Sequence, residues 1–99
     1  MVSRFEWNEA NAAAHLKKHK ISFEIAARVF ADPFALTTQD RIENGEQRWQ
    51  TIGMVDGHLV LLVAHTVTVS DEDATEAICI ISARKADPKE RKRYEQTIR

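Results

Sequence analysis

Residues 48–69, RWQTIGMV-DG-HLVLLVAHTVTV, contain the strongest folding signal in the chain. Asp56-Gly57 is typical of the tight turn that joins two antiparallel strands, because both residues tolerate positive φ. The flanking residues are rich in Val, Leu, Ile and Thr, which pack well on a pleated sheet. We therefore predict a β-hairpin with arms Arg48 to Val55 and His58 to Val69, the second arm being a central strand.

Weaker strand signals lie on both sides of this hairpin. Arg4 to Trp7 alternates polar and apolar residues, which is typical of a short strand. Ala35 to Gln39 predicts a weak strand, and Arg41 to Glu46 predicts a polar loop before the hairpin. After an acidic loop from Ser70 to Asp73, Glu76 to Ser82 predicts a final buried strand.

Three helices are predicted from their capping residues. Asn8 can accept an orphan backbone N–H at the start of an alanine-rich helix that runs to about His19. Ser22 is a second cap, and proline after Asp32 ends the helix that Ser22 begins. Asp87 opens the last helix, with proline at the first helical position and glutamate placed to bond back. The apolar face of the second helix consists of Phe23, Ala26, Ala27 and Phe30.

These elements follow the order β-α-α-β-β-β-β-α and predict an α+β fold, in which an antiparallel-dominated sheet packs against two N-terminal helices and one C-terminal helix. The length of 99 residues is that of a single domain, residues 1–99. No stretch approaches the roughly 20 apolar residues of a membrane span. The N-terminus lacks the apolar region of a signal peptide, so we expect a cytoplasmic location. The single cysteine, Cys79, excludes an internal disulfide.

The net charge of −1 conceals an uneven distribution. Residues 1–20 have a net charge of +2 and residues 84–99 have +4, whereas the residues between them have −7. This composition excludes a uniformly basic protein that coats DNA. If both ends fold onto one surface, that surface attracts anions.

The first candidate site is the basic segment around His19. An imidazole that titrates near neutrality, surrounded by cations, can hold a phosphate and move a proton. Such a run is also typical of a solvated helix end, where cations complement the helix dipole. His15 and His19 are spaced as two zinc ligands are, but they lack the glutamate of an HExxH motif and adjoin repelling lysines, so we expect no metal. The lysines of this segment are Lys17, Lys18 and Lys20.

The second candidate site begins at the end of the last predicted strand. Its spacing suits a phosphate backbone, although a soluble surface helix has the same composition. Arg48, on a predicted strand, adds a rigid fork that can clamp phosphate. The cations of the second set are Arg84, Lys85, Lys89, Arg91, Lys92 and Arg93.

Taken together, these segments resemble the BrnT family of type II toxins, which are small ribonucleases with a RelE-like fold. The resemblance spans residues 5–95 and depends on the order and spacing of its motifs. The motifs are Phe5-Glu6-Trp7-Asn8-Glu9, Lys18-His19, Ile21-Ser22-Phe23-Glu24, Val29-Phe30-Ala31-Asp32-Pro33, Arg48, Ile52-Gly53, Ile80-Ile81-Ser82-Ala83-Arg84-Lys85-Ala86, Glu90-Arg91 and Tyr94-Glu95.

The resemblance implies a metal-free, cofactor-free endoribonuclease that cleaves RNA by attack of a 2′-hydroxyl and inhibits translation. It also implies a hetero-oligomer with a BrnA-type ribbon-helix-helix antitoxin. In this complex only the antitoxin would contact operator DNA. The catalytic residues that it implies are Lys18, His19, Arg48, Arg84, Glu90 and Arg91. The accompanying RNA-binding cations are Lys17, Lys20, Lys85, Lys89 and Arg93.

Five positions depart from the family pattern: Asn8, His15, Lys20, His65 and Cys79. The departure at Cys79 keeps an alternative open. The family usually has arginine where Cys79 stands and tyrosine where His65 stands. We interpret His65 as a possible substitute proton carrier. The alternative function is a catalytically weakened protein of BrnT type that binds the antitoxin and acts as operon co-repressor.

Overall fold

The computed structural model describes residues 3–70, 72 and 75–98. A five-stranded sheet has the spatial order β1-β5-β4-β3-β2, with β1 parallel to β5 and all other neighbours antiparallel. The strands are β1 (Ser3–Glu6), β2 (Leu36–Glu43), β3 (Glu46–Val55), β4 (Leu59–Val69) and β5 (Glu76–Lys85). The helices are α1 (Glu9–His19), α2 (Phe23–Ala27), the short 3-10 helix η1 (Arg28–Ala31) and α3 (Pro88–Ile98). The predicted α+β class with an antiparallel-dominated sheet is therefore confirmed.

Local signals in the sequence determine where the helices begin. The Asn8 side chain accepts from the Asn11 backbone N–H, and Ser22 accepts from Ile25, so both predicted caps are confirmed. At the start of α3, Asp87 and Glu90 each accept the other's backbone N–H, which is the predicted capping box. Each of these helices begins at the residue that its cap dictates.

Three strand boundaries differ from the prediction by two residues or more. β2 continues to Glu43 and β3 begins at Glu46, so the predicted polar loop is mostly strand and turn. The connection is only Asn44-Gly45, both with positive φ. β2 is an edge strand with one side open to water, so its polar composition conceals it from a hydrophobicity pattern. β5 extends to Lys85, three residues beyond the prediction, because the apolar end of β4 pairs with it. The predicted acidic loop of residues 70–73 includes positions 71 and 73, which lie outside the described residues.

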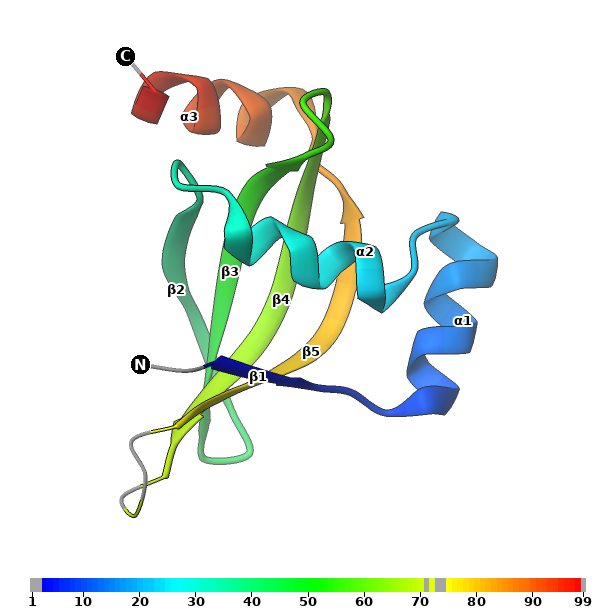
Figure 1. Ribbon diagram of the computed structural model, residues 1–99, viewed down its shortest axis with the longest axis vertical. Helices are drawn as coiled ribbons and strands as arrows, with labels where there is room; N and C mark the ends of the chain where they lie inside the picture. Colours follow the sequence, from blue (N-terminus) through cyan, green and yellow to red (C-terminus); the bar gives the residue numbers. More distant parts are fainter. Residues whose placement is uncertain (1–2, 71, 73–74, 99) are drawn as a thin grey trace.

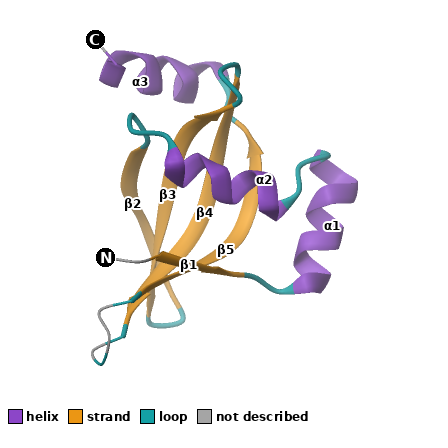
Figure 2. Cartoon of the chain, viewed as in Figure 1, coloured by secondary structure: helices purple, strands orange, loops and turns teal. Residues whose placement is uncertain are grey.

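The sheet has two faces of different composition. Helices α2 and η1 cross one face of the sheet, and α1 lies beside β5 (Figures 1 and 2). The main apolar core forms there from the helices and the inward side chains of β3, β4 and β5. Helix α3 covers only one end of the other face, where Tyr94 packs with Ile52, Val60 and Leu62. Among the described residues, every helix is too short or too polar to span a lipid bilayer.

Gly53 allows η1 to lie directly on β3. A Cβ at this position would come within 2.7 Å of Val29 Cγ1 and 3.0 Å of the Val29 carbonyl oxygen. No side chain fits in that space without moving the helix. The glycine therefore brings the end of η1, and Asp32 after it, onto the sheet.

The Asp32 carboxylate connects three parts of the fold. It accepts hydrogen bonds from the Phe34 N–H at 2.9 Å, from the Met54 N–H at 2.8 Å and from the Tyr94 hydroxyl. β2 begins only at Leu36, opposite Ile52, so the Met54 N–H lies beyond the reach of that strand. Burial raises the pKa of the Asp32 carboxyl, but the three hydrogen bonds outweigh burial and the pKa is lowered. Burial and the nearby carboxylate raise the pKa of Tyr94 to about 12.

Replacing Tyr94 with phenylalanine tests this connection. Tyr94→Phe keeps the packing of the ring and removes the hydroxyl that bonds to the Asp32 carboxylate. We expect a loss of about 1.5–3 kcal/mol in the free energy of unfolding, the usual contribution of a hydrogen bond to a charged group. Urea denaturation at pH 7 measures this loss. An unchanged midpoint would show that the hydroxyl does not secure α3.

His65 lies in the main core and not at the surface. It is 1% exposed and packs edge-to-face against Phe30 at 4.9 Å between ring centroids. Nδ1 lies 3.4 Å from the Thr66 carbonyl oxygen, which can only accept, so Nδ1 carries the proton. Nε2 then accepts from the Thr51 hydroxyl at 2.7 Å, and Thr51 in turn contacts the Thr37 hydroxyl at 2.8 Å. The interpretation of His65 as a substitute proton carrier is therefore wrong, because RNA cannot reach its ring.

Burial lowers the pKa of His65, although Thr66 and Glu76 act against burial. The neutral ring is thus favoured in the folded state, and the unfolded chain takes up the proton first as the pH falls below about 6.5. We expect the free energy of unfolding to decrease between pH 6.5 and 5. His65→Gln should lower stability at pH 7 and flatten this decrease.

Urea denaturation from pH 7.5 to 5 measures this dependence for the wild type, for His65→Gln and for the control His15→Asn. The control is needed because the pKa of His15 is lowered as well, by burial first and then by His19 and Lys18. A wild-type slope in the His65 variant would contradict the assignment.

Candidate functional site

The best-defined polar cluster of the predicted site lies where β5 leads into α3. Arg84 donates from Nη1 and Nη2 to the two oxygens of Glu90, at 2.8 and 2.9 Å. Glu90 also accepts the Asp87 N–H at 2.9 Å. The hydrogen bonds that Arg84 donates to Glu90 raise the pKa of Arg84, and the same bonds lower the pKa of Glu90. An ionised carboxylate with both oxygens engaged holds an arginine better than it accepts a proton.

Arg48 lies on the same sheet face as Arg84. Side chains alternate along a strand, and Ile52 pairs with Leu62, which pairs with Arg84. Arg48 precedes Ile52 by four residues, so it points to the same side about 13 Å further along β3. This face is the one that α3 covers at one end only. The register therefore brings two of the predicted arginines onto one surface.

The contacts of Arg48 are long compared with those of Arg84. Its Nη1 lies 3.7 Å from a Glu43 oxygen and its Nε 3.9 Å from a Glu46 oxygen. The Nε atom is buried and has no hydrogen-bond partner in the part of the chain that the structure describes. The side chain is 22% exposed. Arg48 is thus a cation with unused donor capacity.

Cys79 lies on this face of the sheet, on the same strand as Arg84 and five residues before it. It pairs with Thr66 on β4 and with Glu6 on β1, and its side chain is half-buried. The register therefore places the Cys79 side chain on the sheet face that carries Arg48 and Arg84.

The basic segment of α1 forms a separate group. Lys20 ends the helix with φ of 61°, and its N–H donates to the Leu16 carbonyl. The His19 ring stacks on His15 at 5.4 Å between centroids, and His15 packs against Phe23 at the same distance. The exposed lysines are Lys17, Lys18 and Lys20.

Both basic groups adjoin β5: helix α1 packs against this strand, and Arg84 lies near its end. Within the described residues, no hydrogen bond or ion pair joins Lys18 or His19 to the Arg84 cluster. Among those same residues, no group of three or more His, Cys, Asp and Glu side chains is placed to hold a metal ion. The remaining predicted cations are exposed and surround the end of β5 and α3: Lys85, Lys89, Arg91 and Arg93.

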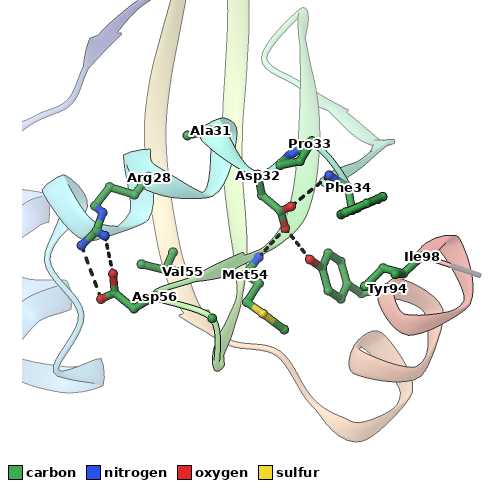
Figure 3. Close-up of a pocket in the computed structure, with 11 residues that line it drawn as sticks. Arg28, Ala31, Asp32, Pro33, Phe34, Met54, Val55, Asp56, Tyr94 and Ile98 are labelled. Carbon is green, nitrogen blue, oxygen red and sulfur yellow. Dashed lines mark hydrogen bonds and ion pairs between the residues drawn. The ribbon is translucent and has the colours of Figure 1, made fainter.

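A cavity of about 530 Å³ lies between η1, the β3–β4 turn and α3 (Figure 3). None of the predicted site residues lines it. Both of its carboxylates have partners, Asp32 as described above and Asp56 in an ion pair with Arg28. Sequence reasoning identified only the helix-ending role of Asp32, since nothing local indicates that Tyr94 bonds to it.

Comparison with known proteins places this chain among the ribonuclease toxins of type II toxin–antitoxin systems. The family model described as "Ribonuclease toxin, BrnT, of type II toxin-antitoxin system" matches residues 7–90. The chain therefore belongs to the BrnT toxin family, and membership implies an antitoxin partner.

A solved structure supports the fold. The crystal structure of the Brucella abortus ribonuclease toxin BrnT is similar to this chain with a TM-score of 0.59. The identity is 20%, and the match covers 88% of this chain and 99% of that chain. The search of curated proteins found no match.

The Arg84–Glu90 pair should contribute measurably to stability. In Glu90→Gln the side chain loses its charge and one of its acceptor oxygens. Because Arg84 is 42% exposed and partly screened, we expect a loss of only about 1 kcal/mol at pH 7. The folded-state pKa of Glu90 is lowered, so its contribution is present above about pH 4.5 and is lost as the pH falls below it.

Urea denaturation of the wild type and Glu90→Gln at pH 7 and pH 3 measures this contribution. The difference between the two proteins should shrink at the lower pH. A difference that is independent of pH would show that the carboxylate charge does not act through Arg84.

Proposed function

We propose that this chain is an endoribonuclease toxin that cleaves RNA by attack of a 2′-hydroxyl on the adjacent phosphate, and thereby inhibits translation in the cytoplasm. The observation that carries the proposal is the placement of Arg48 and Arg84 on one sheet face in a chain of the BrnT family. We also propose that the fold is RelE-like.

The reaction needs a base for the 2′-hydroxyl, an acid for the departing 5′-oxygen and cations for the transition state. We assign the acid or base role to His19, whose ring is supported by the stack on His15. Arg84 binds a phosphate oxygen, with Glu90 holding its fork in a fixed orientation. Lys18, Arg48 and Arg91 are the further catalytic cations. The remaining cations attract and track the RNA backbone: Lys17, Lys20, Lys85, Lys89 and Arg93.

The partner that we propose is a BrnA-type ribbon-helix-helix antitoxin, which forms a hetero-oligomer with the toxin and alone contacts operator DNA. Covering the arginine-bearing face would explain neutralisation, since RNA would then be excluded. An antitoxin bound elsewhere would have to act indirectly.

The second candidate function is a catalytically weakened protein that binds the antitoxin and acts as operon co-repressor. Cys79 favours it, because a side chain without charge stands on the same sheet face as Arg48 and Arg84, at a position where the resemblance implies arginine. The two functions differ in whether the purified chain cleaves RNA.

Substitution of His19 tests the proposal. We expect the wild type, expressed without antitoxin, to arrest growth and to cleave RNA in vitro. His19→Ala should lower cleavage at least about 100-fold, the usual effect of losing an acid–base group. Arg28→Ala is the matched control, since Arg28 is an exposed cation in an ion pair with Asp56, and it lies on η1, which crosses the opposite face of the sheet.

Circular dichroism confirms that each variant is folded. Full cleavage by His19→Ala would remove His19 from the mechanism. A folded wild type that neither arrests growth nor cleaves RNA, yet co-purifies with a small antitoxin, would favour the co-repressor.

A further inference from the structure

The turn between β2 and β3 places two glutamates directly opposite each other. Glu43 pairs with Glu46 across Asn44-Gly45 in the antiparallel register. Like charges at opposed positions destabilise a strand pair. A nearby cation is therefore needed to offset their repulsion.

Arg48 is placed to be that cation. It stands two residues after Glu46 on β3, so both side chains lie on the same sheet face. Its guanidinium approaches Glu43 at 3.7 Å and Glu46 at 3.9 Å, between the two carboxylates. Arg41 also approaches Glu43, at 3.5 Å, but the Arg41 side chain is 72% exposed, so solvent and salt screen its charge more strongly.

Neither carboxylate satisfies Arg48. Both distances exceed hydrogen-bond length, and the buried Nε has no acceptor among the described residues. Arg84 differs, because its two bonds to Glu90 are short and use both oxygens of the carboxylate. Of Arg48 and Arg84, Arg48 is the one whose present partners an incoming anion can replace.

We propose that Glu43 and Glu46 form a built-in anionic competitor for Arg48, so that an RNA phosphate and this acidic pair bind the guanidinium in exchange. The inference rests on the proposed function, since RNA is the anion. The glutamate oxygens are too far from Nε and Nη1 of Arg48 to accept hydrogen bonds. A phosphate oxygen placed near these two atoms would accept them. Binding also leaves Glu43 and Glu46 facing each other without Arg48, which opposes the exchange. The acidic pair thus lowers the affinity of the site for RNA.

RNA binding by charge-neutral variants tests this competition. The probe is a fluorescein-labelled, 2′-O-methylated single-stranded oligonucleotide, which lacks the attacking hydroxyl and is not cleaved. Fluorescence anisotropy at a fixed salt concentration gives Kd for the wild type and for Glu43→Gln/Glu46→Gln. We expect about two- to fivefold tighter binding by the variant, in keeping with the modest strength of exposed ion pairs.

Two further proteins separate local competition from a general change of charge. Glu9→Gln/Glu24→Gln removes the same charge from exposed positions on α1 and α2, and should change Kd less than twofold. In an Arg48→Gln background, the gain from neutralising Glu43 and Glu46 should disappear. The single variant Glu46→Gln repeats the comparison if the double variant does not fold.

Each failure has a distinct meaning. Equal gains in the control, or a gain that persists without Arg48, would overturn the competition by showing a long-range charge effect. Wild-type binding that weakens in Arg48→Gln but does not change in the glutamate variants would overturn it while leaving the RNA site intact. A wild type that does not bind the oligonucleotide, or binds it independently of Arg48, would overturn the proposed role of Arg48 in RNA binding.

Discussion

The Asp32 carboxylate joins three segments that are far apart in the sequence. Its partners Met54 and Tyr94 are 22 and 62 residues away, and through them the end of η1, strand β3 and helix α3 are held together. Each hydrogen bond to an ionised carboxylate is stronger than one between neutral groups. These bonds therefore stabilise the end of the sheet where α3 packs. Gly53 makes this arrangement possible, because any side chain there would keep η1 away from β3. The position of α3, and with it the geometry of Glu90 beside Arg84, depends on this carboxylate.

The two faces of the sheet differ in composition: one forms the main core, and the other carries Arg48 and Arg84. The helix-covered face buries its side chains, and even its polar members, Thr51 and His65, satisfy each other there. The other face is apolar only beneath Tyr94 and carries Arg48 and Arg84 beyond it. A register shift between Ala64 and His65 occurs in the β4–β5 pairing, before the strands reach Arg84. The face on which each charged residue of β5 emerges is therefore set by pairing across the sheet.

The sequence predicted those features whose causes are local. The caps at Asn8 and Ser22, the turn at Asp56-Gly57 and the apolar strands each depend on residues a few positions apart. The site was predictable by residue type but not by arrangement, since the shared face of the two arginines follows from long-range register. His65 illustrates the limit: an isolated histidine in a strand is equally compatible with a proton carrier and with a core residue. Only its burial against Phe30 distinguishes the two.

Two kinds of positive charge act at different distances in this molecule. The chain ends, residues 1–20 and 84–99, have net charges of +2 and +4, and their exposed lysines and arginines produce a field that attracts anions and is screened by salt. Arg48 and Arg84 contribute little to that field, because each lies beside carboxylates that neutralise it. Their contribution is a guanidinium fork held at a defined place on a strand, which matters only when a phosphate is within hydrogen-bond distance. In the proposed function, the exposed cations attract RNA and the two arginines place its phosphates. The carboxylates beside the arginines affect the placement of RNA and not its attraction.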